Sequence, residues 1–381
     1  MARIAVVGAG PSGCSAGYHL ARSGHQVVLI DRAAFPRDKT CGDVVSFGAQ
    51  QPLSAMGLYP AQLAALCAER APFSGLVLGS PNGATNTTRH PLRGYCVPRL
   101  VFDALLHGQA LSVGCKPLQA HVKDLAELEA EYDWVIDARG VHAGTATAIA
   151  MRTYWDVPTA ALDPGEDLLL QIYFERYLGA GYGWIFPVNQ TGGAEGITRF
   201  NIGVGVWLRD YNPEQANARK LLELFVEGNA RARALSELAV TKDRPRGLHL
   251  AGAQRNTRVA AGKVLRIGDA ANLTDPITGE GIQNALTSGM LVAEVINCSQ
   301  SPADVAGNWQ RLYADHFEDH LRAGIRYNGL LRYAPVKNLL VWAMNRSRRV
   351  AERLNAGLFD LVRYNDLAPS LVRSLRAAPP S

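Results

Sequence analysis

The chain has 381 residues, of which 48% are hydrophobic and 19% charged, a balance that is typical of folded globular proteins and excludes a disordered or collagen-like chain. The net charge of +5 is small, and no basic patch interleaved with aromatic residues points to nucleic acid. No apolar run reaches the roughly 18 residues of a transmembrane helix, and the apolar N-terminal stretch is too short for a signal peptide, so we expect a cytoplasmic protein.

The chain opens with a strand, a glycine-rich turn, a helix and a second strand. The strands are predicted over residues 3–7 and 26–30 and the helix over 14–22, and the turn reads Gly8-Ala9-Gly10-Pro11-Ser12-Gly13. An acidic residue, Asp31, follows the second strand, 23 residues after the first glycine. This order and spacing are the fingerprint of a dinucleotide-binding βαβ unit.

Each glycine of the turn has a physical role in this interpretation. Gly8 permits the tight turn, Gly10 lets a pyrophosphate approach the backbone, and Gly13 brings the helix close to the strand. The pyrophosphate then lies at the helix N-terminus, where unpaired N–H groups favour an anion. Asp31 is expected to accept hydrogen bonds from the adenosine ribose, and the neighbouring Arg32 is included in the predicted cofactor site.

A second glycine-rich segment near residue 270 distinguishes FAD from NAD as the dinucleotide. A strand predicted over 263–267 leads into Gly268-Asp269-Ala270-Ala271, and a further helix begins after Gly279, Glu280 and Gly281, at Ile282. A second acid and a second helix N-terminus suit the flavin half of a long cofactor, because the positive helix end stabilises the anionic edge of a reduced flavin ring. The sequence therefore predicts bound FAD, with Asp269 near the ribityl or pyrophosphate.

These motifs resemble the large flavoprotein group that contains aromatic hydroxylases, flavin-dependent halogenases and geranylgeranyl reductases. Three further segments resemble the geranylgeranyl reductase branch, and the whole resemblance spans about residues 3–300. The segments are FPRDKTCGD at 35–43, PRLVFD at 98–103, and GYGWIFP at 181–187 followed by NIGVG at 201–205.

The resemblance implies an α/β fold with a Rossmann-like FAD-binding domain of the glutathione-reductase-like, hydroxylase type, an inserted β-sheet substrate domain and a C-terminal helical segment. The implied ranges are 1–50, 93–160 and 245–300 for the discontinuous FAD-binding domain, 51–92 and 161–244 for the substrate domain, and 301–381 for the helical region.

The resemblance also assigns roles near the flavin. Cys41 and Gly42 are expected beside the ring, where the thiol orients substrate or donates a proton, and Lys39 is a cation that lowers the pKa of such a thiol. Arg99, at the start of a helix, is expected to contact FAD. The alternatives are a small packing residue at Cys41, a solvent-facing side chain at Lys39 and a surface salt bridge at Arg99.

Tyr182 and Trp184 are expected to line the substrate cavity, so the predicted catalytic set is Cys41, Tyr182 and Trp184. Ordinary sheet packing is the alternative for the two aromatic residues. No metal site is predicted, because the six cysteines form no CxxC pair and His316 and His320, four residues apart, have no recognisable third ligand.

We expect an FAD-dependent oxidoreductase that transfers a hydride from reduced flavin to a double bond of an apolar organic or natural-product substrate, free or carrier-bound. NAD(P)H or another reductant would supply the electrons. One alternative is an FAD-dependent monooxygenase that hydroxylates or epoxidises through a flavin C4a-peroxide. Another is a non-catalytic flavin-binding partner, since Asp43 is followed by Val44 where relatives have a glycine.

The C-terminal segment is strongly basic. Residues 321–381 contain ten arginines and one lysine against three acidic residues, a net charge of +8, while the rest of the chain carries −3. Apolar and basic positions alternate along its predicted helices. Such a segment is most often packed on its own domain, but it also fits contact with a peripheral membrane surface or an acidic protein.

Overall fold

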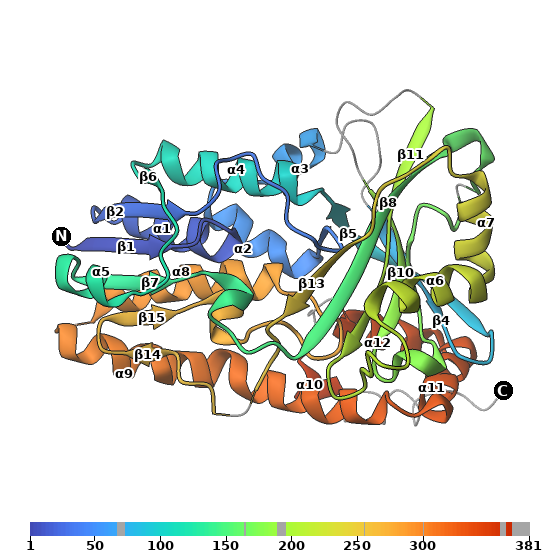
Figure 1. Cartoon of the computed structure of the whole chain (residues 1–381). Helices are drawn as coiled ribbons and strands as arrows, with labels where there is room; N and C mark the ends of the chain where they lie inside the picture. The colour runs from blue at the N-terminus through green and yellow to red at the C-terminus, as the bar shows by residue number, and fades with distance from the viewer. Residues whose placement is uncertain are drawn as a thin grey trace.

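The computed structural model describes residues 1–66, 73–163, 165–188, 196–254, 256–299, 301–358 and 363–367. Two β-sheets lie side by side, and helices cover their faces (Figure 1). The α/β architecture expected from the sequence is confirmed.

The first sheet, here called the parallel sheet, carries the dinucleotide fingerprint. Its described strands, in spatial order, are β14 (Ala260–Ala261), β15 (Val264–Arg266), β7 (Trp134–Asp137), β1 (Arg3–Val7), β2 (Gln26–Asp31) and β6 (Lys116–Gln119). All neighbouring pairs are parallel except β14 with β15. The central strand β1 is apolar on both faces, as expected for a parallel strand with helices on both sides. Because β1 pairs with β2 and β7, the order changes direction at the end of β1, where open α/β sheets bind ligands.

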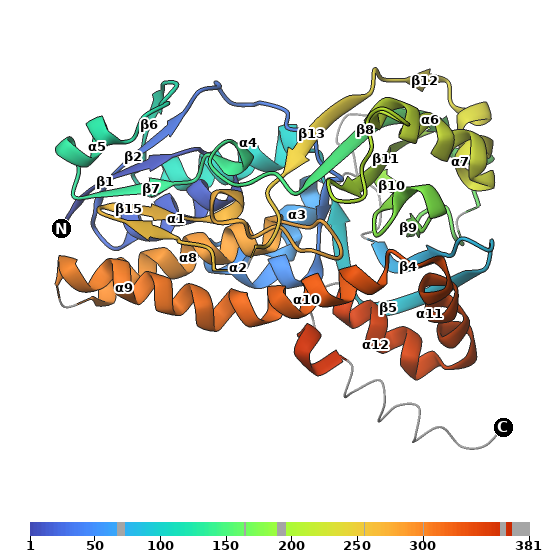
Figure 2. The same cartoon turned by 60° about the horizontal axis from the view of Figure 1, so that its bottom comes forward.

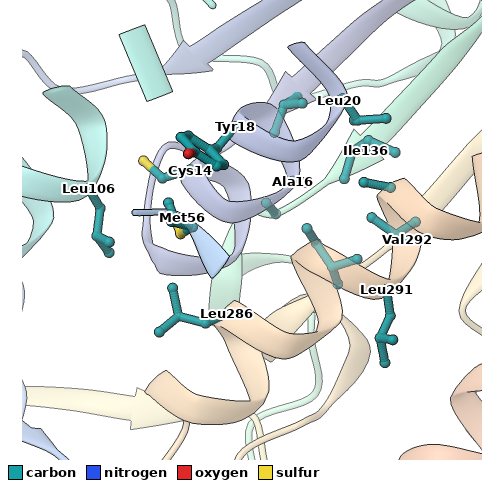
Figure 3. Packing of buried hydrophobic residues seen from close by; sticks show 14 of the residues in the cluster. Cys14, Ala16, Tyr18, Leu20, Met56, Leu106, Ile136, Leu286, Leu291 and Val292 are labelled. Atoms are coloured by element: carbon teal, nitrogen blue, oxygen red, sulfur yellow. The ribbon is translucent and has the colours of Figure 1, made fainter. Parts of the chain in front are cut away.

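Two helices, α1 and α8, pack tightly against each other over the parallel sheet (Figure 3). A Cβ atom at Gly289 of α8 would lie 2.5 Å from the carbonyl oxygen of Ser12 in α1, so a glycine is required for the backbones to approach. Ser15 Oγ of α1 also donates a hydrogen bond of 2.7 Å to the Leu286 carbonyl. This contact fixes the two glycine-rich motifs of the sequence relative to each other.

The second sheet, here called the mixed sheet, is antiparallel apart from the parallel pair β4 and β9. Its described strands, in spatial order, are β12 (Thr241–Lys242), β8 (Ala148–Pro158), β11 (Ile197–Trp207), β10 (Tyr182–Val188), β9 (Leu170–Tyr173), β4 (Phe73–Gly79), β5 (Thr85–Cys96) and β3 (Val44–Val45), with β13 (Arg246–Leu250) also paired to β8.

The C-terminal helices connect the two halves. Helix α9 continues through a π-helical turn, η6, into α10, and the pair runs beneath both sheets, while α11 and α12 pack under β5 (Figure 2).

The described α-helices are α1 (Pro11–Arg22), α2 (Gln50–Ala55), α3 (Pro60–Leu66), α4 (Arg99–Ser112), α5 (Ala126–Glu131), α6 (Ala218–Gly228), α7 (Ala230–Leu238), α8 (Ile282–Cys298), α9 (Pro302–Tyr313), α10 (Asp319–Leu330), α11 (Ala334–Arg346) and α12 (Arg348–Leu358). Short helical turns are η1 (Phe47–Ala49), η2 (Gly140–His142), η3 (Thr159–Ala161), η4 (Arg176–Leu178), η5 (Gly268–Ala271) and η6 (Ala314–Glu318). Among the described residues, no helix combines the length and the apolar character needed to cross a bilayer.

Two strands that the predicted ranges place in the FAD-binding domain pair in the mixed sheet instead. Strands β8 and β13 belong to the mixed sheet, although their residues fall in the predicted ranges 93–160 and 245–300 of the FAD-binding domain. Hydrophobic alternation identifies a strand but not its partner, because pairing depends on residues far away in sequence. The division into domains otherwise remains a prediction.

Candidate functional site

A single continuous cavity of about 680 Å³ joins the parallel sheet to the mixed sheet. Its volume is within the usual range for a cofactor or small-molecule site. Every predicted site residue except Gly13 lines it. Those residues are Gly8, Gly10, Asp31, Arg32, Cys41, Gly42, Arg99, Tyr182, Trp184, Asp269, Gly279, Glu280, Gly281 and Ile282.

The three glycines of the first turn are needed for different reasons: two by the packing of the protein itself, and one to leave space for a ligand. Gly8 has φ of +106°, and a Cβ there would lie 2.2 Å from the Ala138 carbonyl oxygen. A Cβ at Gly13 would lie 1.8 Å from the Gly8 carbonyl oxygen. The protein's own packing thus requires these two glycines. A Cβ at Gly10 would meet only the Arg37 side chain, at 3.6 Å, so Gly10 leaves the cavity side of the turn open, as the approach of a pyrophosphate demands.

Two helix N-termini, those of α1 and α8, meet this cavity. In the described structure neither has a side-chain cap or an acidic residue in its first turn. The first helical hydrogen bonds are donated by Cys14 and Ala285, so the N–H groups before them have no helical acceptor. Two uncapped positive helix ends fit a cofactor with an anionic pyrophosphate at one place and a flavin that becomes anionic on reduction at another.

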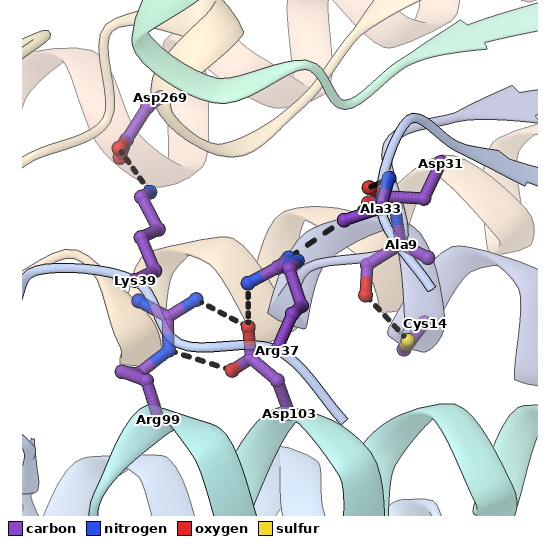
Figure 4. A network of polar contacts seen from close by, with 9 residues as sticks. All are labelled: Ala9, Cys14, Asp31, Ala33, Arg37, Lys39, Arg99, Asp103 and Asp269. Carbon is purple, nitrogen blue, oxygen red and sulfur yellow. Dashed lines mark hydrogen bonds and ion pairs between the residues drawn. The ribbon is translucent and has the colours of Figure 1, made fainter. Parts of the chain in front are cut away.

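Asp31 is held rigidly at the edge of the cavity (Figure 4). Its Oδ2 accepts a hydrogen bond of 2.8 Å from the Ala9 N–H, and its Oδ1 accepts one of 2.9 Å from the Ala33 N–H. These bonds orient the carboxylate at the end of β2 and leave further lone pairs for ribose hydroxyls. Arg37 Nη2 lies 3.8 Å from Asp31 Oδ2.

Arg99 belongs to a buried ion cluster and not to a surface salt bridge. Its side chain is 4% exposed, and its Nε and Nη2 donate hydrogen bonds of 2.6 and 2.7 Å to the Asp103 carboxylate, which also accepts one of 2.8 Å from Arg37 Nη1 (Figure 4). Burial opposes the charge on Arg99, but Asp103 outweighs it and raises the pKa of the guanidinium. Arg37 was not among the predicted site residues, although it lies in the FPRDK segment that resembles the geranylgeranyl reductases. Arg37 connects Asp31 to Asp103 beside the glycine-rich turn that begins at Gly8.

Lys39 pairs with Asp269 at the edge of the cavity. Lys39 Nζ lies 3.7 Å from Asp269 Oδ2, and the Thr274 hydroxyl donates a hydrogen bond of 3.0 Å to Asp269 Oδ1. Burial raises the pKa of the Cys41 thiol, and the nearby Arg99 and Lys39 offset this only in part. The charge of Lys39 therefore acts on the pKa of Cys41 in the expected direction, but burial outweighs it.

An aromatic wall forms the other end of the cavity. Tyr182, Trp184 and Phe186 alternate along β10 with ring centroids 6.1 Å apart in each successive pair. The Tyr182 hydroxyl donates a hydrogen bond to the Thr278 carbonyl of the second glycine-rich segment. On β11, a Cβ at Gly203 would lie 2.2 Å from Trp184 Cζ2, so the glycine of the NIGVG segment makes room for the indole.

A buried polar group behind this wall was missed by the sequence analysis. Asp43 Oδ2 accepts hydrogen bonds from the Tyr154 hydroxyl and from Asn201 Nδ2, the latter at 2.8 Å. Asn201 Nδ2 also donates to the Cys41 carbonyl at 2.7 Å, and its Oδ1 accepts from Trp184 Nε1 at 2.9 Å. The acid of the CGD sequence could have drawn attention to this group. Its partners Tyr154 and Asn201 lie on β8 and β11, however, and only the fold places them beside Asp43.

The loop after η5 is built around one carboxylate. Asp275 Oδ1 accepts hydrogen bonds from the backbone N–H groups of Ile277 and Thr278, at 2.8 and 2.7 Å, and from the Tyr364 hydroxyl at 3.0 Å. The acid of the DPITGEG motif is therefore structural. It fixes the loop that presents Gly279, Glu280 and Gly281 to the cavity and ties the segment 363–367 to that loop.

Comparison with known proteins agrees with this geometry. Residues 3–71 match a family model described as FAD dependent oxidoreductase. The chain is an FAD-dependent oxidoreductase. The prediction of FAD is confirmed, and the residues present fit it: an open glycine turn, two uncapped helix ends and two oriented carboxylates line one cavity.

The resemblance to the geranylgeranyl reductases is also confirmed. The chain is 26% identical to the digeranylgeranylglycerophospholipid reductase of Methanocaldococcus jannaschii, over 86% of both chains. It is 28% identical to the menaquinone reductase of Mycobacterium tuberculosis (strain ATCC 25618 / H37Rv), over 83% of this chain and 80% of the relative. A geranylgeranyl bacteriochlorophyll reductase-like protein from Thermoplasma acidophilum has a TM-score of 0.70 at 20% identity, over 98% of both chains, which confirms the fold.

Proposed function

We propose that the protein reduces a carbon–carbon double bond of an apolar, unsaturated lipid-like substrate. The observation that carries the proposal is the continuous cavity, which joins both FAD motifs to the aromatic wall of β10. The two relatives named above support it, since both are named as reductases, one of menaquinone and the other of digeranylgeranylglycerophospholipids.

The chain's residues divide the cavity between cofactor and substrate. Gly10 and the N-terminus of α1 would hold the pyrophosphate, Asp31 the adenosine ribose, and Asp269 the ribityl or pyrophosphate region. The N-terminus of α8 would face the flavin ring. When bound, FAD supplies the hydride chemistry, while the protein binds, orients and shields the reactants.

The substrate end suits a hydrocarbon. Besides the aromatic wall, Leu76, Leu170, Ile172 and Leu358 line the cavity there, so the double bond would lie among apolar side chains with little water. Exclusion of water orients a flexible chain for transfer and limits side reactions. Cys41 and Gly42 lie between this region and the cofactor motifs, which keeps Cys41 a candidate for contact with the substrate.

An anaerobic half-reaction tests the proposed reduction. The flavin is reduced with one equivalent of dithionite, geranylgeraniol is added, and the flavin absorbance is followed. Reoxidation without oxygen, with one carbon–carbon double bond of the product saturated by two hydrogens, is the expected result. A reaction that requires oxygen and places labelled oxygen in the product would establish the monooxygenase alternative. A second reduction with NADH or NADPH in place of dithionite tests the proposed electron donor.

We also propose that the basic C-terminal region contacts an anionic membrane surface from the cytoplasmic side. Leu339 and Trp342 of α11 are 61% and 54% exposed, and Arg346, one turn further on, lies over the Trp342 ring with its guanidinium carbon 5.1 Å from the centroid. Apolar and cationic side chains on one exposed helix face suit the interface of an anionic bilayer.

Flotation with vesicles tests this contact. Reversal of Arg346, Arg348 and Arg349 to glutamate is expected to reduce binding to phosphatidylglycerol vesicles in a salt-dependent way. Arg219→Glu, a charge reversal on the exposed face of α6, is the control. Equal binding of both proteins and the wild type would reject the membrane contact.

A further inference from the structure

Asp43 is a carboxyl group enclosed in the protein at the cavity wall, with one oxygen unpartnered. The residue is 0% exposed and lines the cavity. In the described structure its Oδ1 has no hydrogen-bond partner, whereas its Oδ2 accepts two hydrogen bonds. A buried polar atom without a partner is costly and usually marks a functional group.

The hydrogen bonds determine where a proton resides on this carboxyl. The Tyr154 hydroxyl and Asn201 Nδ2 both donate to Oδ2, and in this arrangement Oδ2 is fully occupied as an acceptor. A proton on the neutral acid therefore sits on Oδ1. Among the described residues no acceptor reaches Oδ1, and the atom is shielded from solvent. Because Asp43 lines the cavity, the acceptor that remains is a molecule bound directly against it.

Backbone and side-chain hydrogen bonds hold the Asp43 loop and its carboxyl in place. Asp43 has φ of +66°, a left-handed conformation that is uncommon for a residue other than glycine. Its carbonyl accepts a hydrogen bond of 2.8 Å from the Val97 N–H, and Asn201 joins its Oδ2 to the Cys41 carbonyl. Strain of this kind is usually retained where it holds a functional group in place.

The surroundings keep this acid protonated at higher pH than an ordinary aspartate. The groups that face it are Arg152 and Tyr154 on β8, Arg99 on α4 and Cys41 on its own loop. Burial raises the pKa of Asp43 to about 6, against the opposite influence of the Tyr154 and Asn201 hydrogen bonds and of the two arginines. The Cys41 thiol, with a raised pKa, holds its proton more strongly and is the weaker acid of the two.

We propose that Asp43 is the proton donor of the reduction, a proposal that rests on the proposed function. The substrate double bond takes up a hydride at one carbon, from flavin that an external two-electron donor has reduced, and the Oδ1 proton of Asp43 at the other. The π bond is broken, two C–H bonds form, and Asp43 remains as a carboxylate that regains its proton from water. Cys41 then contacts the substrate without supplying the proton.

The first test locates the proton without substrate or activity. Infrared difference spectra of the purified protein between pH 4 and pH 8 should contain a buried carboxylic acid C=O band that disappears on raising the pH through about 6. Asp43→Asn should lack the band, and Tyr154→Phe should shift its loss to higher pH, because the tyrosine hydroxyl stabilises the carboxylate. A spectrum of Asp43→Asn identical to the wild type would overturn the assignment of the proton to Asp43.

The second test is the anaerobic half-reaction with geranylgeraniol. The amide oxygen introduced by Asp43→Asn still accepts from Tyr154 and Asn201, so this variant should retain its FAD while flavin reoxidation slows by about 10²–10⁴-fold, the usual contribution of a general acid. Asp167→Asn, the same change at a buried acid that does not line the cavity, is the matched control and should stay within a few-fold of the wild type. Reoxidation of Asp43→Asn at the wild-type rate would overturn the role. A wild-type enzyme that is not reoxidised would instead reject the proposed function, while the infrared result on Asp43 would still stand.

Discussion

Removal of the Asp103 carboxylate should destabilise the protein far more than removal of an exposed acid with the same helical spacing. Asp103 is 0% exposed and accepts three hydrogen bonds, two from Arg99 and one from Arg37. Asp103→Ala leaves the 4% exposed guanidinium of Arg99 buried without its counter-ion. Truncating one partner of a buried ion pair costs about 3–5 kcal/mol, because the remaining charge is desolvated and unpaired.

The chain contains a matched control for this argument. Arg348 and Glu352 form an ion pair of 2.8 Å with the same i,i+4 spacing, but their side chains are 90% and 43% exposed. Solvent screens such a pair, so Glu352→Ala should cost only about 0.3–0.5 kcal/mol. The two variants therefore separate the effect of burial from that of pairing.

Thermal unfolding of the flavin-free protein measures both variants, and the absence of flavin removes the contribution of FAD binding to the midpoint. For one transition of 381 residues, the entropy of unfolding is about 0.8 kcal/mol/K, so Asp103→Ala should lower Tm by roughly 4–6 °C and Glu352→Ala by less than about 1 °C. Equal, small shifts in both variants would refute the argument that desolvation dominates the Asp103 cluster.

Three other results are expected. Asp269→Ala should lose FAD, measured as flavin released by acid denaturation, with about 1–3 kcal/mol weaker binding because its partners in the cofactor stay unpaired; unchanged occupancy would remove Asp269 from the FAD site. Gly203→Ala should displace Trp184, since the new Cβ would lie 2.2 Å from Cζ2, and a crystal structure with the indole unmoved would contradict this. The folded pKa of Asp43, about 6, lies above its ordinary value of 3.8, so the free energy of unfolding should fall as pH rises between these values, by about 3 kcal/mol in total. In urea titrations, the stability of the wild type relative to Asp43→Asn should fall by this amount over that pH range, because the other titrating groups are common to both proteins.

The sequence by itself determined the elements that hold the cofactor. The turn from Gly8 to Gly13, the strands β1 and β2 and the acid at Asp31 are set by local chemistry, because turn geometry, helix initiation and short apolar runs each act over a few residues. The same holds for β15, the DPITGEG loop and the start of α8. The order of these two glycine-rich motifs along the chain was enough to predict FAD.

The tertiary structure decided which polar side chains meet. Asp43 lies 111 residues from Tyr154 and 158 residues from Asn201 in sequence, and nothing local to Asp43 indicates that β8 and β11 bury it. Pairing of β8 and β13 in the mixed sheet was hidden for the same reason. Burial, oxygens without a partner and raised pKa values depend on residues far apart in the sequence. The cofactor motifs could therefore be predicted from the sequence, whereas the acid proposed to supply the proton could be identified only from the fold.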